Sequence, residues 1–294
     1  MNVNEAIQKL QSDPDIIVTG PDCSDTNKLR VYANGGLIGK IYVGKHPNGS
    51  SDLISSGYYS YSETDGNKSK LENIVCRSKD TLSTLTSDEY ISACKNAVEK
   101  RFGKKKDDAT EQGEKERHVQ TRIVKQFMNH SGSWCVVDME MQCPKEWFKG
   151  NDFSENTTEK PRFDMIVHNK DGIGIVELKV NNDNADNMES HYEHMEFLLT
   201  NSQGQKYFKD EIKRRINVLS ENGLISKSID DFPIDRIWCG FLFVEGGIDG
   251  ARDLVRPLKD RKCAGQLKFL YHPSFDITRI NINNSLYLED FLRK

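Results

Sequence analysis

The stretch that decides the fold runs from Arg162 to Val180 and reads RFDMIVHNKDGIGIVELKV. Its two apolar runs, 162–168 and 172–180, are separated by Asn-Lys-Asp-Gly, a combination of residues typical of a tight turn. Both runs carry apolar residues on both faces, which indicates strands in the middle of a sheet that is covered on two sides. The segment therefore predicts a buried antiparallel hairpin.

A two-residue turn at Lys170 and Asp171 fixes the register of this hairpin. In that register Asp164 lies directly opposite Glu177, and Lys179 shares their face because side chains alternate along a strand. Directly opposed residues have Cβ atoms about 4.5–5.5 Å apart, so the two carboxylates repel each other unless a cation intervenes. A site with oxygen ligands, a few waters and room for a phosphate is typical of Mg²⁺.

The alternative is a surface hairpin that carries a salt bridge. An acid two residues before a lysine is common in a charged sequence, and this chain contains two more, Glu211-Ile-Lys213 and Asp260-Arg-Lys262. Both fall in helix-like polar segments, where residues i and i+2 do not face each other. Of the three, Glu177-Leu-Lys179 alone ends an apolar strand with an acid paired opposite. Spacing by itself leaves both interpretations open.

The segments around the hairpin predict an α/β core in the order αβββαβ, with a mixed central sheet flanked by helices. The expected helices are 114–129, 188–200, 203–222 and 250–262, and the expected strands are 134–141, 162–168, 172–180, 237–244 and 267–271. The first hundred residues differ in pattern. They combine strand-like segments joined by Asn34-Gly35 with a closing helix that starts at the capping box Thr86–Glu89. We therefore expect a small α+β N-terminal domain at 1–103, a charged linker at 104–113 and a second domain at 114–294.

Asp164, twelve intervening residues and Glu177-Leu-Lys179 resemble the motif of the PD-(D/E)XK phosphodiesterases, and the αβββαβ order is similar to the common core of that family. The resemblance covers roughly residues 114–272. One departure is that Pro161 lies three residues before Asp164, whereas the proline of the family motif directly precedes the aspartate. The resemblance implies a restriction-endonuclease-like fold and a metal-dependent nuclease.

The same resemblance implies roles for individual residues. Asp164, Glu177 and the carbonyl of Leu178 would hold one or two Mg²⁺ ions, for which Mn²⁺ would substitute. Lys179 would position the attacking water and stabilise the charge that develops in the transition state. These residues are the expected catalytic and metal-binding set.

The helix at 114–129 supplies a further candidate acid. Glu116 and Gln120 share one face with Ile123 and Phe127, at helical spacing. Many enzymes of the resembled family carry an acid on this helix that completes the metal site, so Glu116 is the candidate ligand and Gln120 a candidate substrate contact. The alternative is a first-turn glutamate that only interacts with the helix dipole.

The helix at 203–222 supplies the expected substrate contacts. Gln203 and Tyr207, four residues apart, resemble the Gln-x-x-x-Tyr motif of RecB-like nucleases. A phosphate track would contain the neighbouring basic residues Lys206, Lys209, Lys213, Arg214 and Arg215. The alternative is a solvated helix whose apolar side is Phe208, Ile212 and Leu219.

His191 and His194, at spacing i and i+3, suggest a metal site, but the sequence places no third zinc ligand. A position near the substrate is a second interpretation, because their helix follows directly from the Lys179 strand. Two surface histidines are the simplest interpretation.

Composition narrows the class of protein. The net charge of −4 argues against a general nucleic-acid coat protein, but an enzyme needs only a local basic track. Seven cysteines without a C-x-x-C pair argue against a disulfide framework or a zinc ribbon. No apolar run is long enough to span a bilayer and the N-terminus has no signal-peptide pattern, so we expect a cytoplasmic protein without a membrane partner.

The function predicted from these residues is a Mg²⁺-dependent endonuclease that acts on nucleic acid, with DNA favoured. Restriction, phage defence, mobile-element processing and repair would all suit such a core. The N-terminal domain would select the target, form a homodimer or bind a partner protein. Two alternatives are a catalytically inactive nuclease fold that binds nucleic acid or a protein, and a metal-dependent phosphodiesterase that acts on a small nucleotide.

Overall fold

The computed structural model describes most of the chain and divides it into two compact units. The described residues are 2–22, 25–43, 54–56, 86–103, 109–128, 132–148, 161–181, 185–226 and 231–293. The first unit contains Met1–Lys125 and Asn222–Leu224, and the second contains Gln126–Glu221 and Ile225–Lys294. No helix among the described residues is both long enough and apolar enough to cross a membrane.

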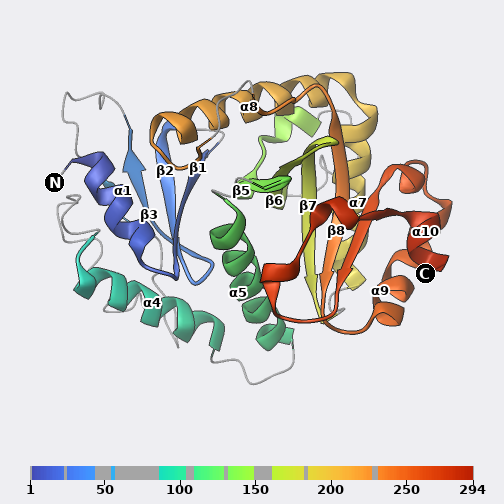
Figure 1. Cartoon of the computed structure of the whole chain (residues 1–294), viewed down its shortest axis with the longest axis horizontal. Coiled ribbons are helices and arrows are strands. Elements are labelled where there is room, and N and C mark those ends of the chain that lie inside the picture. Colours follow the sequence, from blue (N-terminus) through green and yellow to red (C-terminus); the bar gives the residue numbers. More distant parts are fainter. Residues whose placement is uncertain are drawn as a thin grey trace. The chain divides into compact units, whose positions relative to one another are not determined.

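The first unit is a four-stranded antiparallel sheet with helices (Figure 1). Its sheet order is β1-β2-β3-β4, formed by Ile16–Asp22, Asp25–Ala33, Gly36–Tyr42 and Ile54–Ser56. Its helices are α1 (Val3–Ser12), α4 (Asp88–Gly103) and most of α5 (Ala109–Phe127). Asn34 and Gly35 join β2 to β3 with φ angles of 48° and 77°, as a type I′ turn requires, so this predicted hairpin is confirmed. Helix α1 and strand β1 were not predicted from the sequence.

The second unit is built on a mixed six-stranded sheet in the order β10-β9-β8-β7-β6-β5. In chain order its strands are β5 (Trp134–Gln142), β6 (Arg162–Asn169), β7 (Gly172–Val180), β8 (Ile237–Val244), β9 (Lys268–His272) and β10 (Leu286–Tyr287). Strands β7, β8 and β9 run parallel, and the other neighbouring pairs are antiparallel. The predicted α/β fold with a mixed sheet is therefore confirmed.

Helices flank this sheet and connect its strands (Figure 1). The α-helices are α7 (Ala185–Thr200), α8 (Ser202–Glu221), α9 (Ile248–Val255) and α10 (Leu288–Arg293), and a short 3-10 helix, η1, spans Lys145–Phe148. Helix α7 packs against β7 and β8. The helix expected at 250–262 is shorter than predicted, because α9 ends at Val255 and a 3-10 turn over Arg256–Asp260 follows.

Strand β7 is the centre of the second unit, and all nine of its residues are buried. Its pairing with β6 has Met165 opposite Val176 and Asn169 opposite Gly172, which is the register that the sequence predicts. Gly174 leaves room for Trp238 on β8, because a Cβ atom at position 174 would lie 2.2 Å from the indole ring. The hairpin is thus held in one register by a tight turn and by close packing on its neighbour.

The segment expected to be a linker is partly helical. Residues 104–108 lie outside the described residues, whereas 109–113 form the start of α5. The boundary between the two compact units lies within α5, after Lys125, instead of at 104–113. The ammonium group of Lys125 donates to the carbonyls of Gln11, Asp13 and Ile16 at 2.7, 3.0 and 2.8 Å, which fixes α5 to the α1–β1 loop of the first unit.

Candidate active site

Asp164 stands on β6 just beyond the last paired position of the hairpin. Its Oδ2 accepts a hydrogen bond from the backbone N–H of Leu178 at 2.9 Å. A side chain therefore connects the two strands where their paired register ends. Asp164 itself is partly buried.

Glu177 lies on the same face of the neighbouring strand β7 and is fully buried. Its Oε2 contacts Nδ1 of His191, a residue of α7. Its Oε1 is buried and has no hydrogen-bond partner among the described residues. A buried carboxylate oxygen without a partner is unusual in a native protein and calls for a missing proton, water or cation.

The electrostatics of Asp164 show that the two carboxylates act on each other. Burial and the negative charge of Glu177 raise the pKa of Asp164 to about 7, although the positive charges of Lys179 and His191 oppose this rise. In the absence of a further cation, Asp164 therefore holds a proton up to near neutral pH. This is the repulsion that the hairpin register predicts for two opposed acids.

Lys179 follows on the same face of β7, two residues beyond Glu177, and only 2% of its surface is exposed. A lysine is almost never this deeply buried unless charges of opposite sign compensate it. The carboxylate of Asp164 interacts electrostatically with Lys179 and supplies such a charge. The structure thus brings together Asp164, Glu177 and Lys179, the three residues expected to be catalytic.

The donor set of this site fits Mg²⁺ better than zinc. Mg²⁺ is usually bound by one or two carboxylates and completes its shell with water and phosphate oxygens, whereas structural zinc needs four protein ligands. Among the described residues, no three His, Cys, Asp or Glu side chains form a metal-binding group. Asp164 and Glu177 are the described side chains that could hold a Mg²⁺ ion, and Oε1 of Glu177 is the buried oxygen that such an ion would meet.

A third acid, which was not predicted from the sequence, lies beside Asp164 on β5, the strand that pairs with β6 on the side away from β7. Glu140 lies on β5 between the positions paired with Met165 and Phe163, and its φ angle of 50° is rare for a residue with a side chain. Its carboxylate accepts a hydrogen bond from the guanidinium of Arg162 at 3.1 Å. This ion pair compensates the charge of Glu140 beside the two-carboxylate site.

Two candidates belong to the other unit. Glu116 and Gln120 lie on the part of α5 that is assigned to the first unit, with Glu116 partly exposed and Gln120 buried. The site on β6 and β7 is described within the second unit without them. Their proposed roles as metal ligand and substrate contact stay predictions.

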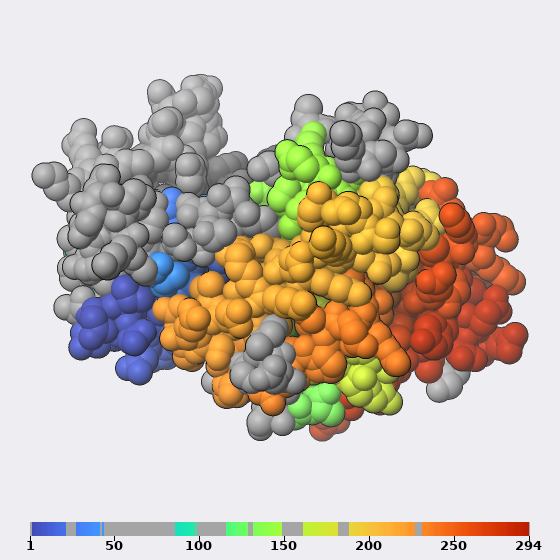
Figure 2. Space-filling model, turned by 90° about the horizontal axis from the view of Figure 1, so that it is seen from above, coloured from blue at the N-terminus to red at the C-terminus, as the bar shows by residue number. Residues whose placement is uncertain are grey.

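Figure 2 shows helix α8, which carries the expected substrate contacts, at the surface. Gln203, Lys206, Tyr207 and Lys213 are exposed. The Tyr207 ring stacks on Trp147 of η1 with a centroid distance of 6.3 Å. Four of the candidate side chains are therefore accessible to a large substrate.

Three other basic residues of α8 have protein partners. Arg215 is fully buried and pairs with Asp138 of β5 and with Glu211, so its proposed place in a phosphate track is wrong. Arg214 donates from Nε to Glu211 at 2.8 Å, and Lys209 donates to the carbonyl of Asp235 at 2.6 Å. Glu211 is buried between the two arginines, and both of them pair with it.

The two histidines of α7 point to different neighbours. His191 contacts Glu177, whereas the His194 ring packs edge-on against Phe148 with a centroid distance of 5.4 Å. Burial, with a smaller contribution from His191, lowers the pKa of His194 to about 4. Both histidines are partly exposed, and each contacts another side chain. His191 was not among the predicted site residues, although its place on the helix that follows Lys179 pointed to it.

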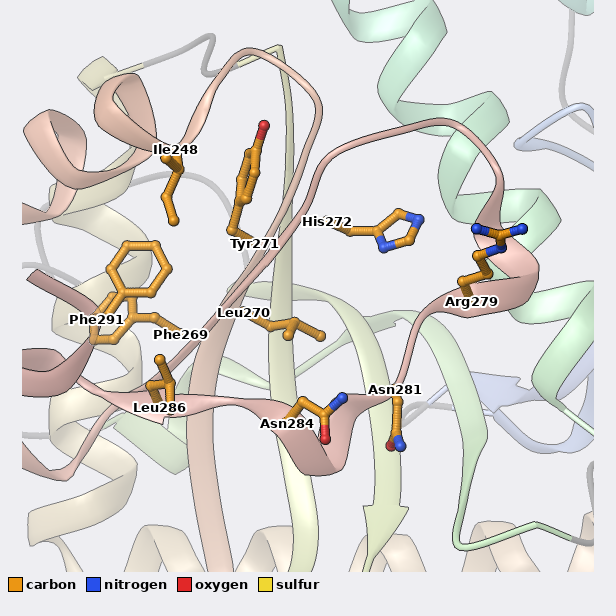
Figure 3. A pocket seen from close by; sticks show the side chains of 10 residues that line it. All are labelled: Ile248, Phe269, Leu270, Tyr271, His272, Arg279, Asn281, Asn284, Leu286 and Phe291. Carbon is orange, nitrogen blue, oxygen red and sulfur yellow. The ribbon is translucent and has the colours of Figure 1, made fainter. Parts of the chain in front are cut away.

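A pocket of about 260 Å³ lies beside β9 and the C-terminal segment, and Figure 3 shows its lining. Tyr271 and Phe269 line it from β9, and Arg279 lines it from the segment that returns to β10. Tyr271 is paired with Phe243, which is paired with Lys179, so Tyr271 lies two strands away from Lys179 at the same level of the sheet. This spacing corresponds to roughly 10 Å. The pocket does not include the two carboxylates.

Comparison of the chain with protein-family models, curated proteins and solved structures finds no match. The function is therefore inferred from the geometry of the site and from the resemblance of its motif.

Proposed function

We propose that this protein is a Mg²⁺-dependent phosphodiesterase that hydrolyses nucleic acid, with Asp164, Glu177 and Lys179 as its active site. The observation that carries the proposal is the buried, unpartnered Oε1 of Glu177 in a site where Asp164 has a raised pKa and Lys179 is also buried. Such a cluster costs stability in the metal-free protein, and a divalent cation would remove the cost. The burial of this cluster argues against the alternative that the hairpin lies at the surface and carries only a salt bridge.

The residues have distinct tasks in this proposal. Asp164, Glu177 and the Leu178 carbonyl would hold the metal, which when bound lowers the pKa of a water and neutralises charge on the phosphate. Lys179 would stabilise negative charge on the phosphate oxygens in the transition state, and its low exposure strengthens this interaction because little water screens it. The hydrogen bond from Leu178 N–H holds Asp164 in place before substrate arrives.

The expectation that the substrate is a nucleic acid, with DNA favoured, is supported by the PD-(D/E)XK-like motif and by the surface of α8. The exposed Lys206, Lys213, Gln203 and Tyr207 offer cations, an amide and an aromatic ring to a polyanion. We infer that the core resembles the restriction-endonuclease-like fold, because β5, β6, β7, α7, α8 and β8 follow one another in the second unit and α5 precedes them in the chain. A restriction or phage-defence endonuclease would combine this core with target selection by the first unit.

The test is a cleavage assay of pure protein with Mg²⁺, Mn²⁺ or EDTA, on plasmid, linear duplex, single-stranded DNA and RNA. We expect cleavage with either metal, none in EDTA, and none with Asp164→Asn. Full cleavage in EDTA contradicts the proposal. Tight binding of a nucleic acid without turnover under any metal condition identifies instead an inactive nuclease fold that binds its target. Turnover of small nucleotides alone identifies the small-molecule phosphodiesterase.

A further inference from the structure

We propose that His191 is a positioning residue of this site, which holds one oxygen of Glu177 and leaves the other as the metal-binding oxygen. The inference rests on the proposed function and extends it to a residue that lies outside the Asp164, Glu177 and Lys179 motif. Nδ1 of His191 contacts Oε2 of Glu177, and the other carboxylate oxygen, Oε1, is buried without a partner among the described residues. The two oxygens of one carboxylate therefore have different tasks.

A carboxylate at the end of a glutamate side chain needs such a partner. The terminal torsion of Glu has a broad, two-fold profile, so the side chain alone does not decide which oxygen faces which neighbour. The Glu177 side chain is 1% exposed and the His191 side chain 24%, so little water competes for their contact. A hydrogen bond to Oε2 thus fixes the orientation of the whole carboxylate.

Helix α7 makes this contact possible. It follows β7 directly in the chain and packs on the face of the sheet that carries Glu177. His194, one turn further along the same helix, packs on Phe148 instead. Since α7 presents a single histidine to Glu177, the two histidines can be compared as matched positions on one helix.

Residues that hydrogen-bond to a metal ligand contribute measurably to metal affinity, and their loss typically weakens metal binding 10–100-fold. A purely structural contact, which only fastens α7 to the sheet, would lower thermal stability and leave metal affinity unchanged. Because the contact uses Nδ1, an asparagine, whose amide lies near the Nδ1 position of a histidine, should replace it. An alanine should not.

The experiment measures Mg²⁺ and Mn²⁺ affinity by calorimetry in the full-length wild type, His191→Ala, His191→Asn and His194→Asn, together with the metal dependence of cleavage. We expect His191→Ala to weaken both affinities about 10–100-fold and to raise the half-saturating metal concentration equally, with most of the rate restored at saturating metal. His191→Asn should stay within about threefold of wild type. His194→Asn should leave metal affinity unchanged, whatever it does to stability.

Wild-type affinity in His191→Ala overturns the inference and leaves the proposed function intact. Equal weakening in the alanine and asparagine variants also overturns it, because the hydrogen bond at Nδ1 would then not be the cause. If His191→Ala does not fold, the comparison of His191→Asn with His194→Asn decides, since a tenfold loss in the first variant contradicts the inference. A wild type that neither binds metal nor cleaves overturns the proposed function, and the inference with it.

Discussion

The side chain of Asp164 accepts a hydrogen bond from the backbone N–H of Leu178, 2.9 Å away, and so joins β6 to β7 where their backbone pairing ends. The carboxylate proposed to bind the metal is thus also part of the sheet. Its two tasks can be separated, because an amide oxygen accepts the same hydrogen bond but is a weak ligand for Mg²⁺.

The first prediction uses that difference. Asp164→Asn and Asp164→Ala should both abolish Mg²⁺ binding and cleavage, because each removes the charge. Asp164→Ala should also leave the Leu178 N–H unpaired and lower the free energy of unfolding by about 1–3 kcal/mol relative to Asp164→Asn. Calorimetry and urea denaturation in EDTA measure the two effects. Equal stability of the two variants would show that the hydrogen bond contributes nothing.

The second prediction concerns pH. Burial and the charge of Glu177 raise the pKa of Asp164 to about 7 in the folded, metal-free protein, far above its value of 3.8 in an unfolded chain. The folded state therefore holds this proton more tightly than the unfolded state. The contribution of Asp164 to the free energy of unfolding is then fully present below pH 4, and it is lost as the pH rises toward 7.

The affinity for metal should depend on pH through the same proton. Mg²⁺ must displace it below pH 7, so affinity should fall about tenfold per pH unit there and level off above pH 8. Urea denaturation in EDTA at pH 5 and pH 8 should show wild type losing stability at the higher pH, with a smaller loss in Asp164→Asn. An identical pH dependence of the two proteins would contradict the assignment of the proton to Asp164.

The sequence contains enough local information to predict the hairpin and the three residues on its inner face. Turn chemistry sets the register of β6 and β7, and the alternation of side chains then places Asp164, Glu177 and Lys179 together. His191 could not be placed in this way. Helical periodicity groups it with His194 within one turn, but only the packing of α7 on the sheet decides that it contacts Glu177.

The burial of Arg215 could have been predicted from the sequence. It lies three residues after Ile212 and four before Leu219, so it belongs to the buried stripe of α8 and not to a basic track. Its partner Asp138 lies 77 positions earlier, on β5, and no local pattern joins the two. The bonds from Lys125 to Gln11, Asp13 and Ile16 likewise connect positions more than 100 residues apart, so no local pattern shows them.

The third prediction tests the buried charges of α8. Arg215→Met should destabilise the protein by about 3–5 kcal/mol, because it leaves Asp138 buried without the cation that compensates it. The control Arg256→Met removes an exposed ion pair with Asp253 and should change stability by less than about 1 kcal/mol. Urea denaturation measures both. A stable Arg215→Met protein with weakened DNA binding would restore Arg215 to the substrate-binding residues.

The fourth prediction concerns the remaining basic residues of that helix. Replacing the exposed Lys206 and Lys213 by alanine should weaken nucleic-acid binding and reduce the slope of log affinity against log salt by about one unit for each phosphate that is no longer neutralised. The double variant Lys259→Ala, Lys262→Ala makes the same change in net charge at exposed positions outside α8. Fluorescence anisotropy across a salt series compares them. Equal slopes in the two double variants would place the substrate track elsewhere.

The fifth prediction separates an enzyme from an inactive binding protein and concerns Lys179. In an enzyme its charge acts on the phosphate in the transition state, so Lys179→Met should lower the single-turnover rate about 10²–10³-fold, as the loss of one such electrostatic group does. Equilibrium binding of the same substrate should change far less, because many other phosphate contacts remain.

Lys170→Met is the matched control, since it makes the same substitution at the exposed tip of the same hairpin. Its rate and binding should equal those of wild type. Thermal melting is needed for Lys179→Met, because a buried ammonium that interacts with the Asp164 carboxylate also supports the fold. If the folded variant loses rate and affinity by equal factors, Lys179 contributes to binding and not to the chemical step. If wild type shows no turnover and Lys179→Met alters affinity alone, the site is a binding site that retains the residues of an enzyme.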